Sequence, residues 1–131
     1  MMSDQLLTQE QTTVGLKAAL RIISAWQASS DQACKILRIS PSTLRRAAAD
    51  PGSVRRLDQD QQQRIGLVLG VHASLREVFT NQANVTSFPR LQNGNAFFEG
   101  RSPLEVMAQG DMISLYETFK RIDQLRHLAH G

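Results

Sequence analysis

Apolar residues recur at steps of three and four along most of this 131-residue chain. Between about residues 11 and 27, Leu16, Leu20 and Ile23 place a single apolar face on a helix. No stretch of four to eight residues alternates apolar and polar side chains as a half-buried strand does. The spacing therefore predicts an all-α fold of roughly six or seven helices.

Capping residues mark where these helices begin. Three pairs have the spacing of a capping box: Ser29 with Gln32, Asp58 with Gln61, and Ser102 with Glu105. The helix that follows Asp58 is expected to reach Phe79. Gly110 suits the left-handed position that ends a helix, and Asp111 can cap the last one.

The polar segment 81–87 is the one candidate linker in the sequence. It predicts a helical domain over residues 1–80 and a second, smaller helical domain over residues 81–131. The last helix is expected to end before the terminal segment 127–131.

The cellular setting follows from what the sequence lacks. No apolar run approaches the roughly 18 residues needed to cross a bilayer. The N-terminus has no basic-then-apolar leader, and a single cysteine, Cys34, cannot form an intramolecular disulfide. We expect a cytoplasmic protein without membrane association.

Positive charge is concentrated in one part of the chain, although the formal net charge is only +3. Residues 35–56 contain six basic side chains against one acidic side chain, Asp50: Lys35, Arg38, Arg45, Arg46, Arg55 and Arg56. Such a local excess favours a phosphate-rich partner, because phosphate neutralisation is a local event. A solvated basic face is the alternative interpretation of charge taken by itself.

The same region has the anatomy of a helix-turn-helix, with the motif over residues 30–48. One small residue and three apolar residues have the spacing needed to fill the core between two crossed helices: Cys34, Leu37, Ile39 and Leu44. Ser40 can cap the second helix, with Pro41 as its first residue. Arg38 occupies the turn position that is most often glycine, so a left-handed backbone there costs about 1 kcal/mol.

The second helix of this motif is expected to bind operator DNA. The candidate contacts are Arg38, Ser42, Thr43, Arg45 and Arg46. Arginine can hold guanine through two hydrogen bonds, and hydroxyls can bind phosphates or base edges. One motif reads only a few base pairs, so a homodimer is expected. A helical hairpin with a purely structural role remains the alternative.

Residues 95–123 resemble the C-terminal domain of Xre/ParS-type antitoxins, the partners of RES-domain toxins in bacterial type II toxin–antitoxin modules. The resemblance rests on Asn95, the run Gly100-Arg101-Ser102-Pro103-Leu104, the break at Gly110 and the amphipathic last helix. With the preceding helices included, it covers most of the chain from residue 10 onward.

This resemblance implies an antitoxin and not an enzyme, with no catalytic residue and no cofactor. Its partner would be a RES-type toxin that attacks NAD⁺, blocked sterically, while the complex represses its own operon. The resemblance and the apolar pattern together place toxin binding at Phe98, Arg101, Leu104, Met107, Met112, Tyr116, Arg126, His130 and Gly131. Arg101 has an internal clamp as its equally supported alternative.

Two further interpretations stay open at this point. The chain could be a stand-alone transcriptional regulator with a C-terminal dimerisation module, or a binding protein whose helix-turn-helix is retained only for folding. A metal site is not expected, because His127 and His130 share a helical face with Asp123 but lack a fourth ligand.

Overall fold

The computed structural model describes residues 8–130, and the side chains of residues 8–128. Within this part the chain is all helical, with seven α-helices, two short 3-10 helices and no strand. In chain order the elements are α1 (Gln9–Ala25), α2 (Ser30–Leu37), α3 (Pro41–Ala49), η1 (Pro51–Ser53), α4 (Gln59–Val78), α5 (Gln82–Ser87), η2 (Phe88–Arg90), α6 (Pro103–Met107) and α7 (Met112–His130). The predicted fold class is confirmed.

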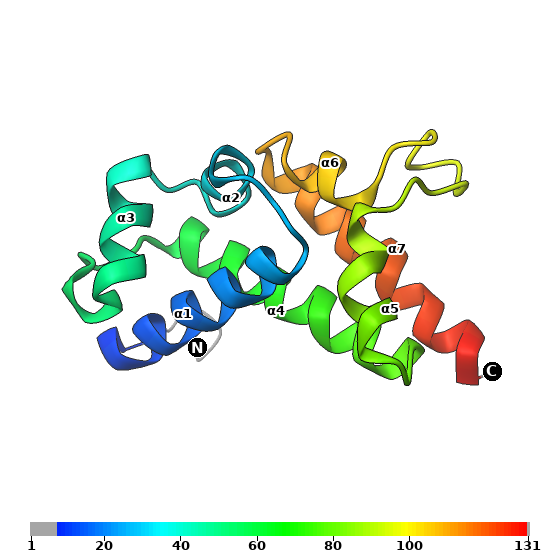
Figure 1. Ribbon diagram of the computed structural model, residues 1–131, viewed down its shortest axis with the longest axis horizontal. Coiled ribbons are helices and arrows are strands. Elements are labelled where there is room, and N and C mark those ends of the chain that lie inside the picture. Colours follow the sequence, from blue (N-terminus) through cyan, green and yellow to red (C-terminus); the bar gives the residue numbers. More distant parts are fainter. Residues whose placement is uncertain (1–7, 131) are drawn as a thin grey trace, which may run out of the picture.

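The long helix α4 organises the molecule. Figure 1 shows α1, α2 and α3 at one end, α5, α6 and α7 at the other, and α4 running between them. It packs against α1 on one side and against α7 on the other. The buried apolar residues form one continuous cluster that includes Leu16 and Ile23 of α1, Val68 of α4, and Leu115 of α7. The hydrophobic core is therefore shared across the predicted domain boundary at residue 80.

Glycine allows α4 and α7 to approach closely. A Cβ atom placed on Gly70 would lie 2.8 Å from the Cε1 atom of Phe119, a separation that real Cβ atoms do not reach. Gly66, one turn earlier, has no such neighbour within 4 Å. Of these two glycines in α4, only Gly70 is required by the packing.

All three predicted capping boxes are present. Ser29, Asp58 and Ser102 each accept a hydrogen bond from the third residue of the following helix, whose side chain returns one to the cap. A fourth box, Thr8 with Gln11, begins α1. These caps satisfy amide groups that would otherwise lack partners at the helix starts.

Two boundary predictions are wrong. The expected linker over residues 81–87 is mostly helix α5, because Asn81 caps it (Oδ1 accepts from the Ala83 amide at 2.7 Å) and Val85 is buried. The last helix does not end before residue 127 but continues to His130. There Arg126 bonds Asp123 at 2.9 Å and is paired with Glu77 of α4 at 3.2 Å, which ties this turn to the bundle.

Candidate functional site

The turn between α2 and α3 has the geometry that the sequence predicts. Arg38 has φ 56° and ψ 47°, in the left-handed region, and the Ile39 amide donates to the Cys34 carbonyl at 3.0 Å. Ser40 then caps α3 by accepting from the Thr43 amide at 3.1 Å. The two helices and their turn therefore form a helix-turn-helix.

Helix α3 presents a polar face to solvent. Ser42, Arg45 and Arg46 are exposed, whereas Thr43 is half-buried and Ala47 faces the core. The hydroxyls of Ser42 and Thr43 lie 3.1 and 3.0 Å from the Ser40 hydroxyl, within a small network at the start of the helix. Two arginines and one serine are thus directly available to a ligand.

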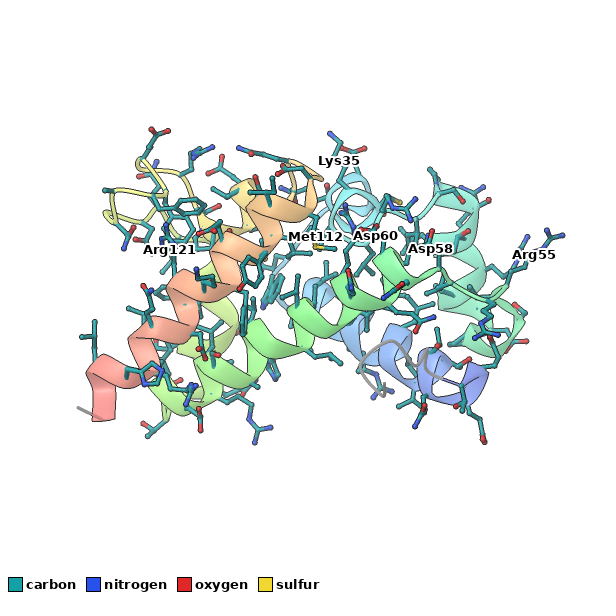
Figure 2. All side chains as sticks on the ribbon, turned by 180° about the vertical axis from the view of Figure 1, so that it is seen from behind. Lys35, Arg55, Asp58, Asp60, Met112 and Arg121 are labelled. Atoms are coloured by element: carbon teal, nitrogen blue, oxygen red, sulfur yellow. The ribbon has the colours of Figure 1, made fainter. Side chains whose placement is uncertain are left out.

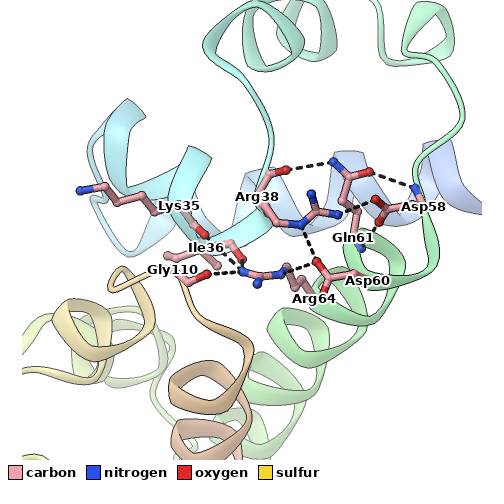
Figure 3. A network of polar contacts seen from close by, with 8 residues as sticks. All are labelled: Lys35, Ile36, Arg38, Asp58, Asp60, Gln61, Arg64 and Gly110. Atoms are coloured by element: carbon pink, nitrogen blue, oxygen red, sulfur yellow. Dashed lines mark hydrogen bonds and ion pairs between the residues drawn. The ribbon is translucent and has the colours of Figure 1, made fainter.

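Arg38 is held by the start of α4. Its guanidinium donates to Asp58, and its Nε donates to Asp60 Oδ2 at 2.6 Å (Figure 3). Its carbonyl accepts from the Gln61 side chain at 2.9 Å. These contacts stabilise the left-handed turn, and they occupy the donors with which Arg38 was expected to reach DNA.

These contacts also shift the acids toward their charged forms. The pKa of Asp58 is lowered, first by the Gln61 backbone amide and then by Arg38. Burial by itself would raise the pKa of Asp60, but hydrogen bonds from Arg38 and Arg64 outweigh it and lower that pKa. Both carboxylates therefore remain ionised partners of the turn.

Sequence reasoning missed a buried arginine beside this network. The side chain of Arg64 is only 5% exposed, and its Nε donates to Asp60 Oδ2 at 2.9 Å. Its Nη1 donates to the carbonyl of Gly110 at 2.8 Å and to that of Ile36 at 3.3 Å (Figure 3). Arg64 therefore joins the end of α2, helix α4 and the α6–α7 turn. The sequence did offer one signal for this ion pair, because Arg64 follows Asp60 by four residues on the predicted helix and is followed by a largely apolar stretch.

The ion pairs separate the basic residues of segment 30–66 into two groups. Lys35 is paired with Asp31 at 3.2 Å, and Arg38 and Arg64 share Asp58 and Asp60 as described. Four exposed arginines form no ion pair within the described part of the chain: Arg45, Arg46, Arg55 and Arg56. The uncompensated positive charge therefore lies on α3 and on the segment that leads to α4.

Three of the predicted toxin-binding residues are not on the surface. Phe98, Leu104 and Met107 are 2%, 5% and 0% exposed. They fill the core beneath the loop that precedes α6 and beneath α6 itself, so the expectation that they form a contact face is corrected. Leu104 and Met107 were identified by apolar spacing, which cannot distinguish a core face from a partner face, and Phe98 by the expectation that one of two adjacent aromatic residues is exposed.

An exposed apolar surface does exist between α4 and α7, and Met112 and Tyr116 belong to it. Together with Leu67 and Ile113 they line a shallow groove, called here the α4–α7 groove. Ile113 is 73% and Tyr116 is 46% exposed. Sequence reasoning missed Ile113, because it lies outside the apolar stripe of α7. Met112 is labelled in Figure 2, beside the start of α4.

The remaining predicted contacts have internal partners or lie at the chain end. Arg101 donates to the Phe98 carbonyl at 2.8 Å and pairs with Glu99 at 3.5 Å, as its clamp alternative requires. Arg126 has the acidic partners given above. The side chain of His130, and Gly131, lie outside the described residues.

Cysteine and histidine form no further site in the part of the chain that the structure describes. No group of three or more His, Cys, Asp or Glu residues is placed to hold a metal ion there. Burial raises the pKa of the half-buried Cys34 thiol, and burial followed by the charge of Arg76 lowers the pKa of His72. Both groups are thereby held in their neutral forms. No described helix is sufficiently long and apolar to span a membrane.

Comparison with known proteins assigns the chain to a family. The model of the antitoxin Xre-like helix-turn-helix domain matches residues 5–70, which include α1, α2, α3 and the first part of α4. The chain is also 30% identical over 113 residues to the uncharacterized protein y4oB of Sinorhizobium fredii (strain NBRC 101917 / NGR234), a match that covers 85% of this chain and 83% of that protein. No solved structure matches this chain. The chain therefore belongs to the antitoxin Xre-like helix-turn-helix family.

Proposed function

We propose that this chain is the antitoxin of a type II pair, which covers a RES-type toxin and represses its own operon by binding operator DNA. Membership of its family indicates a DNA-binding antitoxin or regulator. The observation that carries the proposal is the exposed face of α3, where Arg45 and Arg46 lack acidic partners among the described residues.

The DNA-binding half of the proposal uses α3 as the recognition helix. Arg45 and Arg46 reach guanine edges or phosphates in the major groove, and Ser42 binds at the start of the helix. The protein acts as a homodimer, which places two α3 helices on half-sites about one turn of DNA apart. Substitution of both arginines by alanine lowers operator affinity if the motif reads DNA, and leaves it unchanged if the motif serves folding only.

The toxin-binding half uses the α4–α7 groove. Methionine and aromatic side chains are enriched at the centres of protein interfaces, and this groove offers Met112 and Tyr116 beside the exposed Ile113. Neutralisation is steric, so it requires a covering surface and no catalytic group. The toxin is an enzyme that consumes NAD⁺, and the antitoxin closes its active site.

Growth of a bacterial host tests the antitoxin role. Expression of the adjacent gene is expected to arrest growth, and coexpression of this chain to relieve the arrest, with copurification of the two proteins. Ile113→Asp with Tyr116→Asp is expected to abolish the relief, because charge is costly in an apolar interface. Val14→Asp with Leu91→Asp, at two exposed apolar sites outside the groove and outside the chain end, is the matched control and retains relief.

The alternative is a stand-alone regulator whose C-terminal half serves dimerisation. It remains because the family match covers residues 5–70, and so speaks for the DNA-binding part alone. Absence of growth arrest, combined with operator binding, would favour the regulator. Relief of arrest after deletion of residues 126–131 would exclude the chain end as the blocking element and retain the antitoxin role.

A further inference from the structure

We propose that Arg55 and Arg56 form a second DNA contact, which binds backbone phosphates beside the recognition helix. The inference rests on the proposed DNA-binding function and adds a site outside the helix-turn-helix motif. Neither residue is part of α3, and neither was among the expected DNA contacts.

Ion pairs account for only part of the positive charge in segment 30–66. Lys35, Arg38 and Arg64 each have an acidic partner, so three of the seven basic residues of this segment are paired internally. Arg55 and Arg56 are exposed and form no ion pair with any described residue. Half of the remaining positive charge in this segment therefore lies outside α3.

Buried residues flank the two arginines on both sides. They stand between Val54 and Leu57, each of which is only 5% exposed. The carbonyl of Val54 accepts from the Gln9 side chain at 3.2 Å, and that of Leu57 accepts from the Gln62 side chain at 2.9 Å. The backbone on both sides is thus held in place, which lowers the cost of ordering the backbone when a ligand binds.

Location supports the same conclusion. The 3-10 helix η1, which leads into this pair, packs against α3. Figure 2 shows Arg55 projecting into solvent at the end of the molecule that holds α3. A duplex seated on α3 would therefore meet positive charge from both segments.

The acidic residues next to this pair have internal partners. Asp58 and Asp60 follow directly in the sequence and would repel phosphate, but both are bound to Arg38. The carboxylate of Asp50 accepts from the Gly52 amide at 3.2 Å, within its own turn. The acids around this segment are therefore occupied by internal partners. A guanidinium that remains free can bind phosphate through two parallel hydrogen bonds.

Phosphate contacts have a signature that base contacts and folding effects lack. Each neutralised phosphate releases counterions and contributes about 0.9 to the slope of log affinity against log salt. Loss of two contacts lowers the slope by about 1.8 for each bound protomer, so the fall in affinity between about 50 and 200 mM salt becomes about 12-fold smaller per protomer. Because phosphates carry no sequence information, the effect is the same on any duplex.

The experiment compares Arg55→Ala/Arg56→Ala with the wild-type full chain. Affinity is measured across salt concentrations for a random-sequence duplex and for the duplex directly upstream of the gene. Arg76→Ala/Arg90→Ala removes two other exposed arginines, at the far end of α4 and in η2, and is the matched control. The proposal expects a lower slope on both duplexes for the first variant, the wild-type slope for the control, and recovery in Arg55→Lys/Arg56→Lys.

Three outcomes would overturn the proposal. A wild-type slope in the Arg55→Ala/Arg56→Ala variant would show that the pair does not bind phosphate. Loss of copurification with the toxin at an unchanged slope would assign the pair to an acidic partner surface instead. Failure of the wild-type chain to bind either duplex would refute DNA binding as a whole, a result distinct from the first two.

Discussion

Arg64 offers the sharpest test of how the two ends of this molecule are held together. Its guanidinium contacts three elements at once, through Asp60, the Ile36 carbonyl and the Gly110 carbonyl. Arg64→Met keeps an unbranched apolar side chain that matches the aliphatic stem of the arginine, and it removes every one of these hydrogen bonds. The variant therefore isolates the polar contribution.

The magnitude follows from burial. Loss of one partner from a buried charged pair costs about 3–5 kcal/mol. Asp60 is 38% exposed and keeps Arg38 as a partner, so the lower end of that range applies, and the methionine recovers part of it by apolar burial. We expect the free energy of unfolding to fall by about 2–3 kcal/mol, a large share of the total for a domain of this size.

Urea unfolding followed by circular dichroism measures this loss. With a slope of about 1.5 kcal/mol per molar urea, the midpoint falls by about 1.3–2 M. Arg76→Met makes the same substitution at an exposed site of the same helix and is expected to leave the midpoint unchanged. A shift below about 0.5 M for Arg64→Met would refute the reasoning, because the guanidinium would then be dispensable.

Three further predictions follow from local geometry. Gly66→Ala should raise the free energy of unfolding by about 0.5–1 kcal/mol, because alanine has the higher helix propensity. Gly70→Ala should lower it by about 1–3 kcal/mol, because the added Cβ clashes with Phe119. Urea unfolding curves of the two variants that shift in the same direction would contradict this packing. The pKa of Asp60 lies below its ordinary value of 3.8, so its carboxylate contributes to folding stability above that pH, and the contribution is lost as the pH falls through the lowered pKa. The urea midpoints at about pH 6 and pH 3 should therefore differ less in Asp60→Asn than in the wild type. Arg38→Gly relieves about 1 kcal/mol of left-handed backbone strain but loses two exposed ion pairs of similar total worth, so its urea midpoint should stay near that of the wild type. Arg38→Ala loses the same ion pairs and keeps the strain, so it should be less stable.

Local chemistry was the part of the fold that the sequence made predictable. A capping box needs two side chains three residues apart, so Ser29, Asp58 and Ser102 each identified a helix start that the structure contains. The left-handed turn at Arg38 was predictable because Arg38 occupies the position of the helix-turn-helix motif that is most often glycine.

Features that depend on contacts between distant segments were not predictable. The carbonyls of Ile36 and Gly110 that accept from Arg64 lie 28 and 46 residues away in sequence, and no local pattern specifies them. The apolar spacing of Leu104 and Met107 was correctly detected but assigned to the wrong side of the helix, since core and interface obey one periodicity. Positive charge was located in sequence, but only the ion pairs showed which arginines remain free.

The long helix α4 also determines how this architecture can be divided. The family match ends at residue 70, yet α4 continues to Val78, with Val71 and Leu75 fully buried beyond that limit. A gene fusion joined at residue 70 would separate helices α1, α2 and α3 from the apolar residues that complete the core around α4. Recombination that preserves this core must therefore keep α4 whole and transfer α4 and α7 as one unit.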